Sequence, residues 1–174
     1  MKKLLTLSLI TLIISCAPIR VNHDYDKAVN FSKYKTYKYF SDIKTGLTPL
    51  DEKRFLDALD LKMTQNGFKV SNNPDFLIDI KSTQIQTAPR QTVGVGLGGN
   101  GGAIGGGISI GLPVGQPNLS RQITIDFVDK KGVGLFWQAQ STSSYKPNTT
   151  PLKRETRLQA IANKMLKAYP PKVK

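Results

Sequence analysis

The residues that most resemble a functional motif are the glycines of residues 93–115. This segment holds eleven of the fifteen glycines in the chain. Residues 94–99 match G-x-G-x-x-G, a pattern in which backbone N–H groups at a helix N-terminus bind dinucleotide phosphates. That function needs a helix directly after the glycines, but more glycine, Pro113 and Pro117 follow, which opposes a helix. No Lys-Ser or Lys-Thr pair closes the segment as a P-loop requires. We therefore expect no nucleotide site here.

The same segment has the features of a β-hairpin. Aliphatic residues alternate with glycine on both sides of residues 99–102, a Gly-Asn-Gly-Gly sequence that readily adopts the positive φ of a tight turn. One face would be nearly bare backbone, which another strand or a lipid headgroup could approach closely. A flexible excursion without function is the alternative, because ordering so much glycine costs entropy. We expect a glycine-rich hairpin or loop over residues 91–120.

Few side chains suit catalysis or metal binding. His23 is the only histidine and Cys16 the only cysteine, so catalytic triads, His/Cys zinc sites and intrachain disulfides lack their parts. A metal site formed by His23, Asp24 and Asp26 would need further ligands. We expect no metal, no catalytic residue and no cofactor other than a covalent lipid, described below.

Two pairs of aspartates could act as the acid and base of a hydrolase, Asp75 with Asp79 and Asp126 with Asp129. The first pair falls on the outward face of a predicted strand and the second runs into a turn. Structural, solvated carboxylates are therefore the favoured interpretation. A hydrolase would require two of these acids to face each other across a cleft.

The first residues predict export and lipid attachment. Lys2 and Lys3 precede an apolar run of eleven residues, 4–14, which is shorter than the roughly 20 residues of a membrane-spanning helix. Residues 13–16, Ile-Ile-Ser-Cys, resemble the lipobox of bacterial lipoproteins. The resemblance implies cleavage between Ser15 and Cys16 and acyl groups on Cys16, and two or more acyl chains make membrane attachment durable.

This interpretation divides the chain into a signal peptide (residues 1–15), a lipidated tether (residues 16–22) and one domain (residues 23–174), a usual size for a single core. In enterobacterial lipoproteins, an aspartate directly after the lipidated cysteine resembles a signal for retention in the inner membrane. Ala17 stands there instead. We therefore expect a cell-envelope protein anchored in the outer membrane and facing the periplasm.

The chain is strongly basic, with 25 Lys and Arg residues against 12 Asp and Glu residues. Loss of Lys2 and Lys3 with the signal peptide lowers the formal charge from +13 to +11. The cations are dispersed and form no nucleic-acid-binding motif, so nucleic acid is not an expected partner. On a tethered protein this charge favours an anionic lipid or polysaccharide surface. A lysine-rich surface that only aids solubility is the equal alternative.

Hydrophobic periodicity indicates the elements that position these residues. Thr48-Pro49 and Thr150-Pro151 are typical helix starts, and Gly67 and Pro170-Pro171 are typical ends. Apolar residues follow each start at helical spacing: Phe55, Leu56, Leu59 and Met63, then Leu158, Ile161, Ala162, Met165, Leu166 and Tyr169. Strands are predicted over residues 31–40, 75–81, 121–128 and 135–140, with a hairpin turn at residues 129–132.

These elements predict an α+β fold, with an antiparallel sheet, two helices packed on one face and the glycine-rich hairpin as an excursion. Alternation predicts that Phe76, Ile78, Ile80, Ile123, Ile125 and Phe127 face inward. The lysines of residues 31–40 favour an edge position for that strand. Trp137 is expected in the core with its indole N–H hydrogen-bonded.

Several stretches resemble the bacterial lipoprotein family known as domain of unknown function 4136. They are Tyr25-Asp26, residues 30–37 (Asn-Phe-Ser-Lys-Tyr-Lys-Thr-Tyr), residues 74–78, residues 125–129, residues 135–138 and Tyr169-Pro170-Pro171. The resemblance implies an envelope lipoprotein with a compact α+β domain and a glycine-rich excursion between two strands. It carries over no catalytic residue.

The sequence thus predicts a lipid-anchored envelope lipoprotein that is not an enzyme and that binds or supports another envelope component. The alternative is an accessory module that binds a glycan or lipid through Tyr34, Trp137 or the hairpin. A hydrolase that uses the aspartates is the third hypothesis. The identity of the partner and the oligomeric state stay open.

Overall fold

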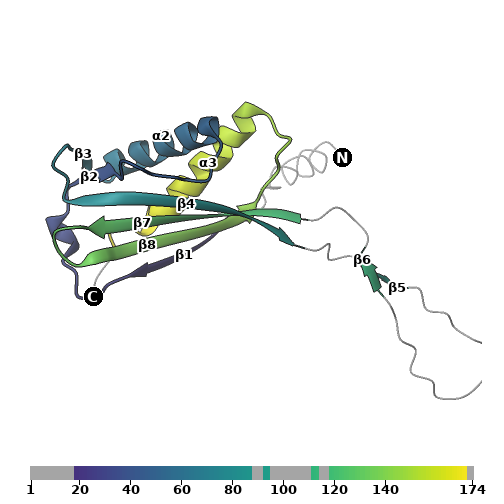
Figure 1. The fold of residues 1–174 in the computed structure, drawn as a ribbon, viewed down its shortest axis with the longest axis horizontal. Helices are drawn as coiled ribbons and strands as arrows, with labels where there is room; N and C mark the ends of the chain where they lie inside the picture. Colours follow the sequence, from purple (N-terminus) through teal and green to yellow (C-terminus); the bar gives the residue numbers. More distant parts are fainter. Residues whose placement is uncertain (1–17, 88–91, 95–110, 114–117, 172–174) are drawn as a thin grey trace, which may run out of the picture.

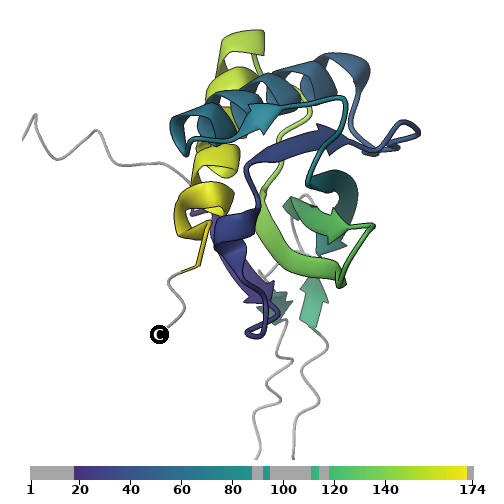
Figure 2. The same ribbon diagram turned by 90° about the vertical axis from the view of Figure 1, so that its left-hand side faces the viewer.

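A six-stranded sheet organises the computed structural model, which describes residues 18–87, 92–94, 111–113 and 118–171 (Figure 1). The strand order is β1-β8-β7-β4-β2-β3, so β1 and β3 are the edges of an open sheet. The bounds are β1 (Arg20–Tyr25), β2 (Thr36–Tyr39), β3 (Lys69–Val70), β4 (Phe76–Thr87), β7 (Asn118–Asp129) and β8 (Gly134–Ser144). Helices α2 (Pro49–Gln65) and α3 (Pro151–Met165) lie on one face of this sheet (Figure 2). The predicted α+β fold is confirmed.

The sheet is mixed rather than wholly antiparallel. β1, β8, β7 and β4 pair antiparallel, but β2 runs parallel to both β3 and β4. The prediction missed this end of the sheet because α2 connects β2 to β3 as a crossover, which brings the next strand back in the same direction. The hairpin predicted at residues 129–132 is present and joins β7 to β8.

Both helices begin where the Thr-Pro pairs predict. The Thr48 side chain accepts a hydrogen bond from the backbone N–H of Asp51, and the Thr150 side chain accepts one from the N–H of Lys153. Gly67 follows the C-terminus of α2 with a φ of +88°, a conformation that favours glycine. Within the described residues, no helix is both long enough and apolar enough to cross a membrane.

The core lies between the sheet and the helices. The strand residues predicted to face inward are all buried, and so are the apolar residues predicted for the two helices, except Leu56, which is half-buried. Aromatic rings fill the centre of this layer. The ring centroids of Phe76 and Phe127 lie 4.8 Å apart, and the ring of Tyr169 is edge-on to that of Phe127 with 4.7 Å between centroids. Trp137 is in the core as predicted, but its indole N–H has no hydrogen-bond partner among the described residues, contrary to expectation.

The N-terminal part of the domain differs from the prediction in two places. The expected tether, residues 16–22, overlaps β1, whose register pairs Val21 with Ser141 of β8. The expected strand over residues 31–40 is divided into a 3-10 turn, Phe31–Lys33, and β2, because the Asn30 side chain accepts a hydrogen bond from the N–H of Ser32 and starts the turn. β2 lies inside the sheet, next to the two-residue edge strand β3.

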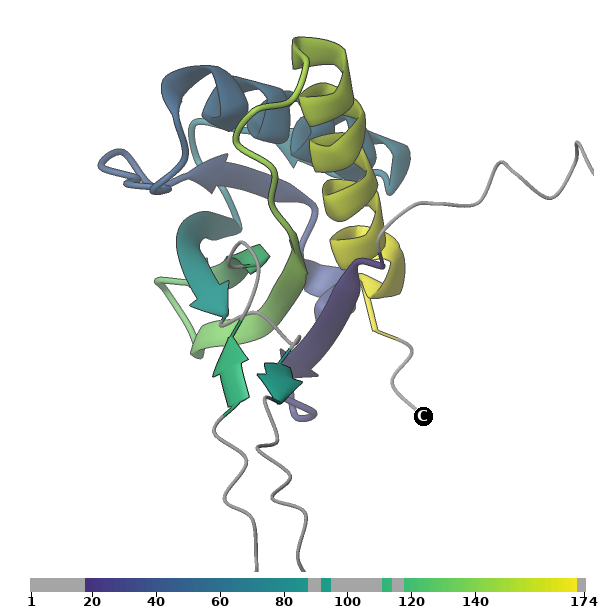
Figure 3. The ribbon, with the colours of Figure 1, turned by 90° about the vertical axis from the view of Figure 1, so that its right-hand side faces the viewer.

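The glycine-rich segment leaves the sheet between β4 and β7, which pair from Leu77–Val128 to Thr87–Asn118. Two short strands, β5 (Thr92–Gly94) and β6 (Gly111–Pro113), pair antiparallel in a separate two-stranded sheet (Figure 3). The predicted pairing of the two sides is therefore present at its base. The predicted turn at residues 99–102 lies outside the described residues.

Candidate functional site: an arginine-lined pocket

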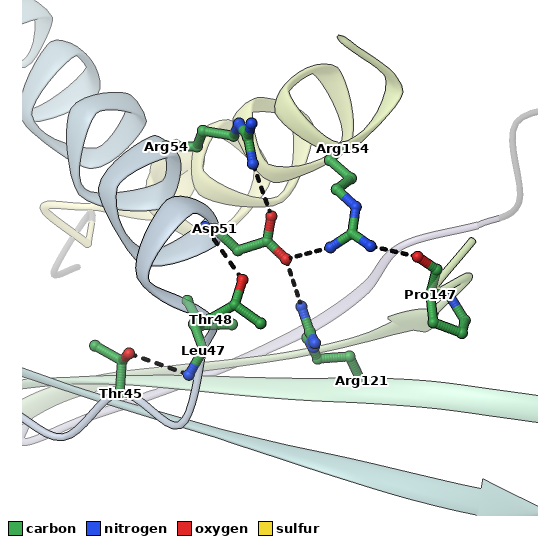
Figure 4. Close-up of polar contacts among 8 residues, drawn as sticks. All are labelled: Thr45, Leu47, Thr48, Asp51, Arg54, Arg121, Pro147 and Arg154. Carbon is green, nitrogen blue, oxygen red and sulfur yellow. Dashed lines mark hydrogen bonds and ion pairs between the residues drawn. The ribbon is translucent and has the colours of Figure 1, made fainter. Parts of the chain in front are cut away.

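A buried aspartate in the first turn of α2 is the centre of the candidate site. Asp51 is 2% exposed. The loop before the helix holds it in place: Gly46 has a φ of +70°, and a Cβ there would lie 2.6 Å from the carbonyl oxygen of Ser82 on β4, so only glycine fits. The N–H of Ser82 donates to the Thr45 carbonyl at 2.7 Å. The Thr48 cap then sets the first turn on this loop (Figure 4).

Three arginines from three elements converge on the Asp51 carboxylate (Figure 4). Arg54 of α2 donates to Oδ1 at 3.1 Å, and Arg154 of α3 donates to Oδ2 at 2.9 Å. The Nη1 atom of Arg121, on β7, lies 3.6 Å from Oδ2. Arg154 also donates to the carbonyl of Pro147, which ties α3 to the loop after β8. One carboxylate therefore faces three permanent positive charges.

Arg121 is the most unusual member of this cluster, because it is only 4% exposed. Its guanidinium lies 3.7 Å from the centre of the Tyr145 ring, close enough for a cation–π interaction. Its Nε atom is buried and has no hydrogen-bond partner among the described residues. A buried donor without a partner is rare in folded proteins and is costly. The Nε–H group of Arg121 can therefore donate a hydrogen bond to an acceptor on a bound ligand.

A pocket of about 280 Å³ opens beside this cluster, between the start of α3 and the end of β8. Its charged lining consists of one carboxylate and five cations: Asp51, Arg121, Lys146, Lys153, Arg154 and Arg157. The lining thus carries a surplus of four positive charges. The ring of Tyr145 and the core residues Leu158 and Ile161 supply an apolar part. Such a pocket suits an anion that carries an apolar group.

Asp51 follows the predicted helix start at Thr48-Pro49, and Arg121 begins the predicted strand of residues 121–128, but their sequence positions do not indicate that they meet. One signal was present. Arg121 continues the alternation of Ile123, Ile125 and Phe127, so its side chain belongs to the face of β7 that the helices cover. A charged residue at an inward position of a strand points to a buried ionic partner.

The four aspartates considered for hydrolysis have structural partners. One Asp75 oxygen accepts hydrogen bonds from the N–H groups of Lys35 and Thr36, and Asp79 pairs with Lys81 at 2.8 Å. Burial by itself opposes ionisation of Asp75, but these backbone hydrogen bonds outweigh it and lower the pKa of the carboxyl.

The other pair behaves in the same way. Asp126 accepts a hydrogen bond from Gln138 at 2.7 Å, and Asp129 is buried against Tyr34 and Lys33. Asp79 and Asp126 are cross-strand neighbours on β4 and β7, on the sheet face away from the helices. The arrangement fits the favoured interpretation of these acids as structural carboxylates.

The remaining candidate residues lie elsewhere. His23 is on β1, where its Nε2 atom lies 2.7 Å from the Met165 carbonyl at the end of α3. No group of three potential metal ligands occurs within the part of the chain that the structure describes. Tyr34 and Trp137 are 2% and 1% exposed, so the hypothesis that a glycan or lipid binds through either of these two side chains is wrong. Ser15 and Cys16 lie outside the described residues.

The fold is that of an α+β protein, with an open sheet and both helices on one face (Figure 2). The chain belongs to the family described as Domain of unknown function (DUF4136), which matches residues 21–171. No curated protein matches it.

Two solved structures are similar to this fold. A PDZ domain protein from Parabacteroides distasonis is 16% identical with a TM-score of 0.56; the match covers 89% of this chain, which spans 36% of that protein. The PelC dodecamer from Paraburkholderia phytofirmans is 11% identical with a TM-score of 0.50, over 86% of this chain and 95% of that one. At these identities the likeness concerns the fold alone.

Proposed function

We propose that this protein is a lipid-anchored, non-enzymatic binding module of the cell envelope, and that the arginine-lined pocket binds an anionic envelope component. The surplus of four positive charges in the pocket lining, which includes the buried Arg121, is the observation that carries the proposal. A tethered binding module needs a concave site with a few convergent polar groups, and this pocket has both.

The anchor part of the proposal rests on the N-terminal residues. The basic start, the apolar run and the cysteine at position 16 support cleavage before Cys16, acylation of its sulfur and attachment to the outer membrane, facing the periplasm. The first buried residue after this segment is Ile19, directly before β1, so the domain would lie close to the membrane.

The anchor is tested by mass spectrometry of the native protein together with membrane fractionation. We expect a mature chain that starts at an acylated Cys16 and sediments with the membranes. The Cys16→Ala variant should keep residues 1–15 and carry no acyl group. A native protein with an intact Met1, or a mature start without acyl groups, would contradict the anchor.

The binding function is tested with the native protein in an uncharged detergent and with soluble anions as probes. Oligogalacturonate represents carboxylated glycans and butyl phosphate represents phosphorylated lipids. We expect at least one of them to bind, with an affinity that falls as salt increases. The variant Lys146→Gln/Lys153→Gln removes two exposed pocket lysines and should weaken binding about tenfold or more, since each charge-assisted contact contributes about 1 kcal/mol.

The matched control is Lys27→Gln/Lys69→Gln, which removes the same charge from two exposed lysines outside the pocket lining. We expect its affinity to stay within about twofold of the native value. If both double variants weaken binding equally, the pocket is not the site and general positive charge is the cause. If neither anion binds to the native protein, the proposed function is wrong.

A further inference from the structure

We infer that the ligand of this pocket is a phosphate monoester attached to an apolar group, the chemistry of a phosphorylated lipid headgroup. The inference rests on the proposed anion-binding function and specifies the class of ligand. Three features of the described residues support it: the amount of charge, the start of α3 and the apolar wall.

The amount of charge favours a dianion. Asp51 already supplies one carboxylate, yet four positive charges of the lining remain in excess. A second carboxylate would add only one negative charge, whereas a phosphate monoester carries about −1.5 to −2 at neutral pH. Guanidinium groups also match phosphate oxygens with two parallel hydrogen bonds, and the Arg121 Nε has no partner among the described residues.

The start of α3 lacks the acidic residues that usually complement a helix N-terminus. The first turn of α2 contains Asp51 and Glu52, but that of α3 contains no acid and has Lys153 and Arg154 at the same positions. Cations near the positive end of a helix dipole are unfavourable, and an anion there relieves the repulsion. A phosphate in the pocket would lie beside this helix start, because Thr149, Lys153 and Arg154 all line it.

The apolar wall indicates that the phosphate carries a hydrocarbon group. Tyr145, Leu158 and Ile161 line the same pocket. The volume, about 280 Å³, is at the lower limit of about 300 Å³ for small-molecule pockets. It therefore accommodates a headgroup and the first carbons of a chain, while a longer chain would remain outside.

The test is isothermal titration of the native protein, in an uncharged detergent, with butyl phosphate, butyrate and inorganic phosphate. We expect butyl phosphate to bind about tenfold or more tightly than butyrate, because of its second charge. We expect a similar advantage over inorganic phosphate, because the hydrocarbon chain of butyl phosphate covers the apolar wall and leaves water. Inorganic phosphate that binds as tightly as butyl phosphate would instead identify a free phosphate and overturn the lipid assignment.

Two variants locate the effect. Lys146→Gln/Lys153→Gln should weaken butyl phosphate binding about tenfold or more, and Lys27→Gln/Lys69→Gln should not. Arg121→Lys keeps the charge but removes the guanidinium donors, so it should reduce the preference for butyl phosphate over butyrate; a thermal melt shows whether this variant is folded. Butyrate or oligogalacturonate binding without a preference for phosphate would overturn this inference and leave the anion-binding function standing. Failure of every anion to bind would overturn both.

Discussion

Two buried aspartates, Asp129 at the end of β7 and Asp51 of α2 beside its start, are stabilised in different ways. Asp129, the last residue of the strand, accepts hydrogen bonds from the Tyr34 hydroxyl at 3.0 Å, from Lys33 at 3.2 Å and from the N–H of Lys131 at 3.0 Å. Only one of these donors is a cation. Near the start of the strand, Arg121 is one of three arginines around Asp51.

The difference separates a structural carboxylate from a candidate binding site. At Asp129, one cation, a neutral hydroxyl and a backbone N–H satisfy the carboxylate, and the charges balance. At Asp51, the guanidinium groups exceed what one carboxylate can neutralise, and a pocket lies beside them. Buried charge that is unbalanced within the protein costs stability, and an external anion reduces that cost. The comparison therefore indicates that an imbalance of charge, rather than burial alone, distinguishes the candidate binding site from a structural carboxylate.

The largest expected effect is at Asp51. Asp51→Asn removes the only carboxylate of the pocket lining and leaves Arg121 buried without its counter-ion, so we expect a loss of about 3–5 kcal/mol in the free energy of unfolding. Urea unfolding measures it. The control is Asp57→Asn on the same helix, whose ion pair with Lys53 is exposed. That change should cost less than about 1 kcal/mol. Equal effects at the two positions would mean that Asp51 is not the counter-ion of the cluster.

A smaller loss is expected at Asp129, because its donors are mixed and one partner is partly exposed. Asp129→Asn should cost about 2 kcal/mol at neutral pH, since charge-assisted hydrogen bonds contribute about 1.5–3 kcal/mol. Asp126→Asn, on the same strand, is the control; its amide still accepts from Gln138, so we expect a change within about 0.5 kcal/mol.

The effect of Asp129 should also depend on pH. Burial opposes ionisation of this carboxyl, but the hydrogen bonds from Lys33 and Tyr34 outweigh burial and lower its pKa. A lowered pKa means that the stabilisation is complete above the unfolded value of about 4 and is lost as pH falls through the lower folded value. The difference between the native protein and Asp129→Asn should therefore shrink below about pH 4. A difference that stays constant down to pH 2 would contradict an ionised Asp129.

The smallest of the three effects is expected for Tyr34→Phe. The variant loses the hydroxyl that donates to Asp129 but keeps the ring, which stacks on Phe136 at 4.1 Å. Since Lys33 and the N–H of Lys131 remain, we expect a loss of about 1 kcal/mol. Thermal unfolding measures it. A loss of stability larger than that of Asp129→Asn would contradict this expectation. It would show that the Tyr34 hydroxyl maintains the ring packing in addition to its hydrogen bond with Asp129.

Local patterns made much of the fold predictable. The helix starts at Thr48 and Thr150 follow from a capping side chain and a proline, and the inward faces of β4 and β7 follow from alternation. β1 was missed because its polar sequence shows little alternation and its strand state comes from pairing with β8, more than a hundred residues away. The parallel position of β2 was missed because a crossover cannot be seen in a single segment.

The sequence by itself determined the secondary structure of most elements, the family and the expectation of a lipid anchor, because each depends on neighbouring residues or on a short motif. Only the tertiary structure decided which charges meet. Asp51 and Arg154 are 103 residues apart, and neither has a neighbour in sequence that indicates the other. Packing of α2 and α3 on one face of the sheet brings them to Arg121, because side chains interact through space at a few ångströms.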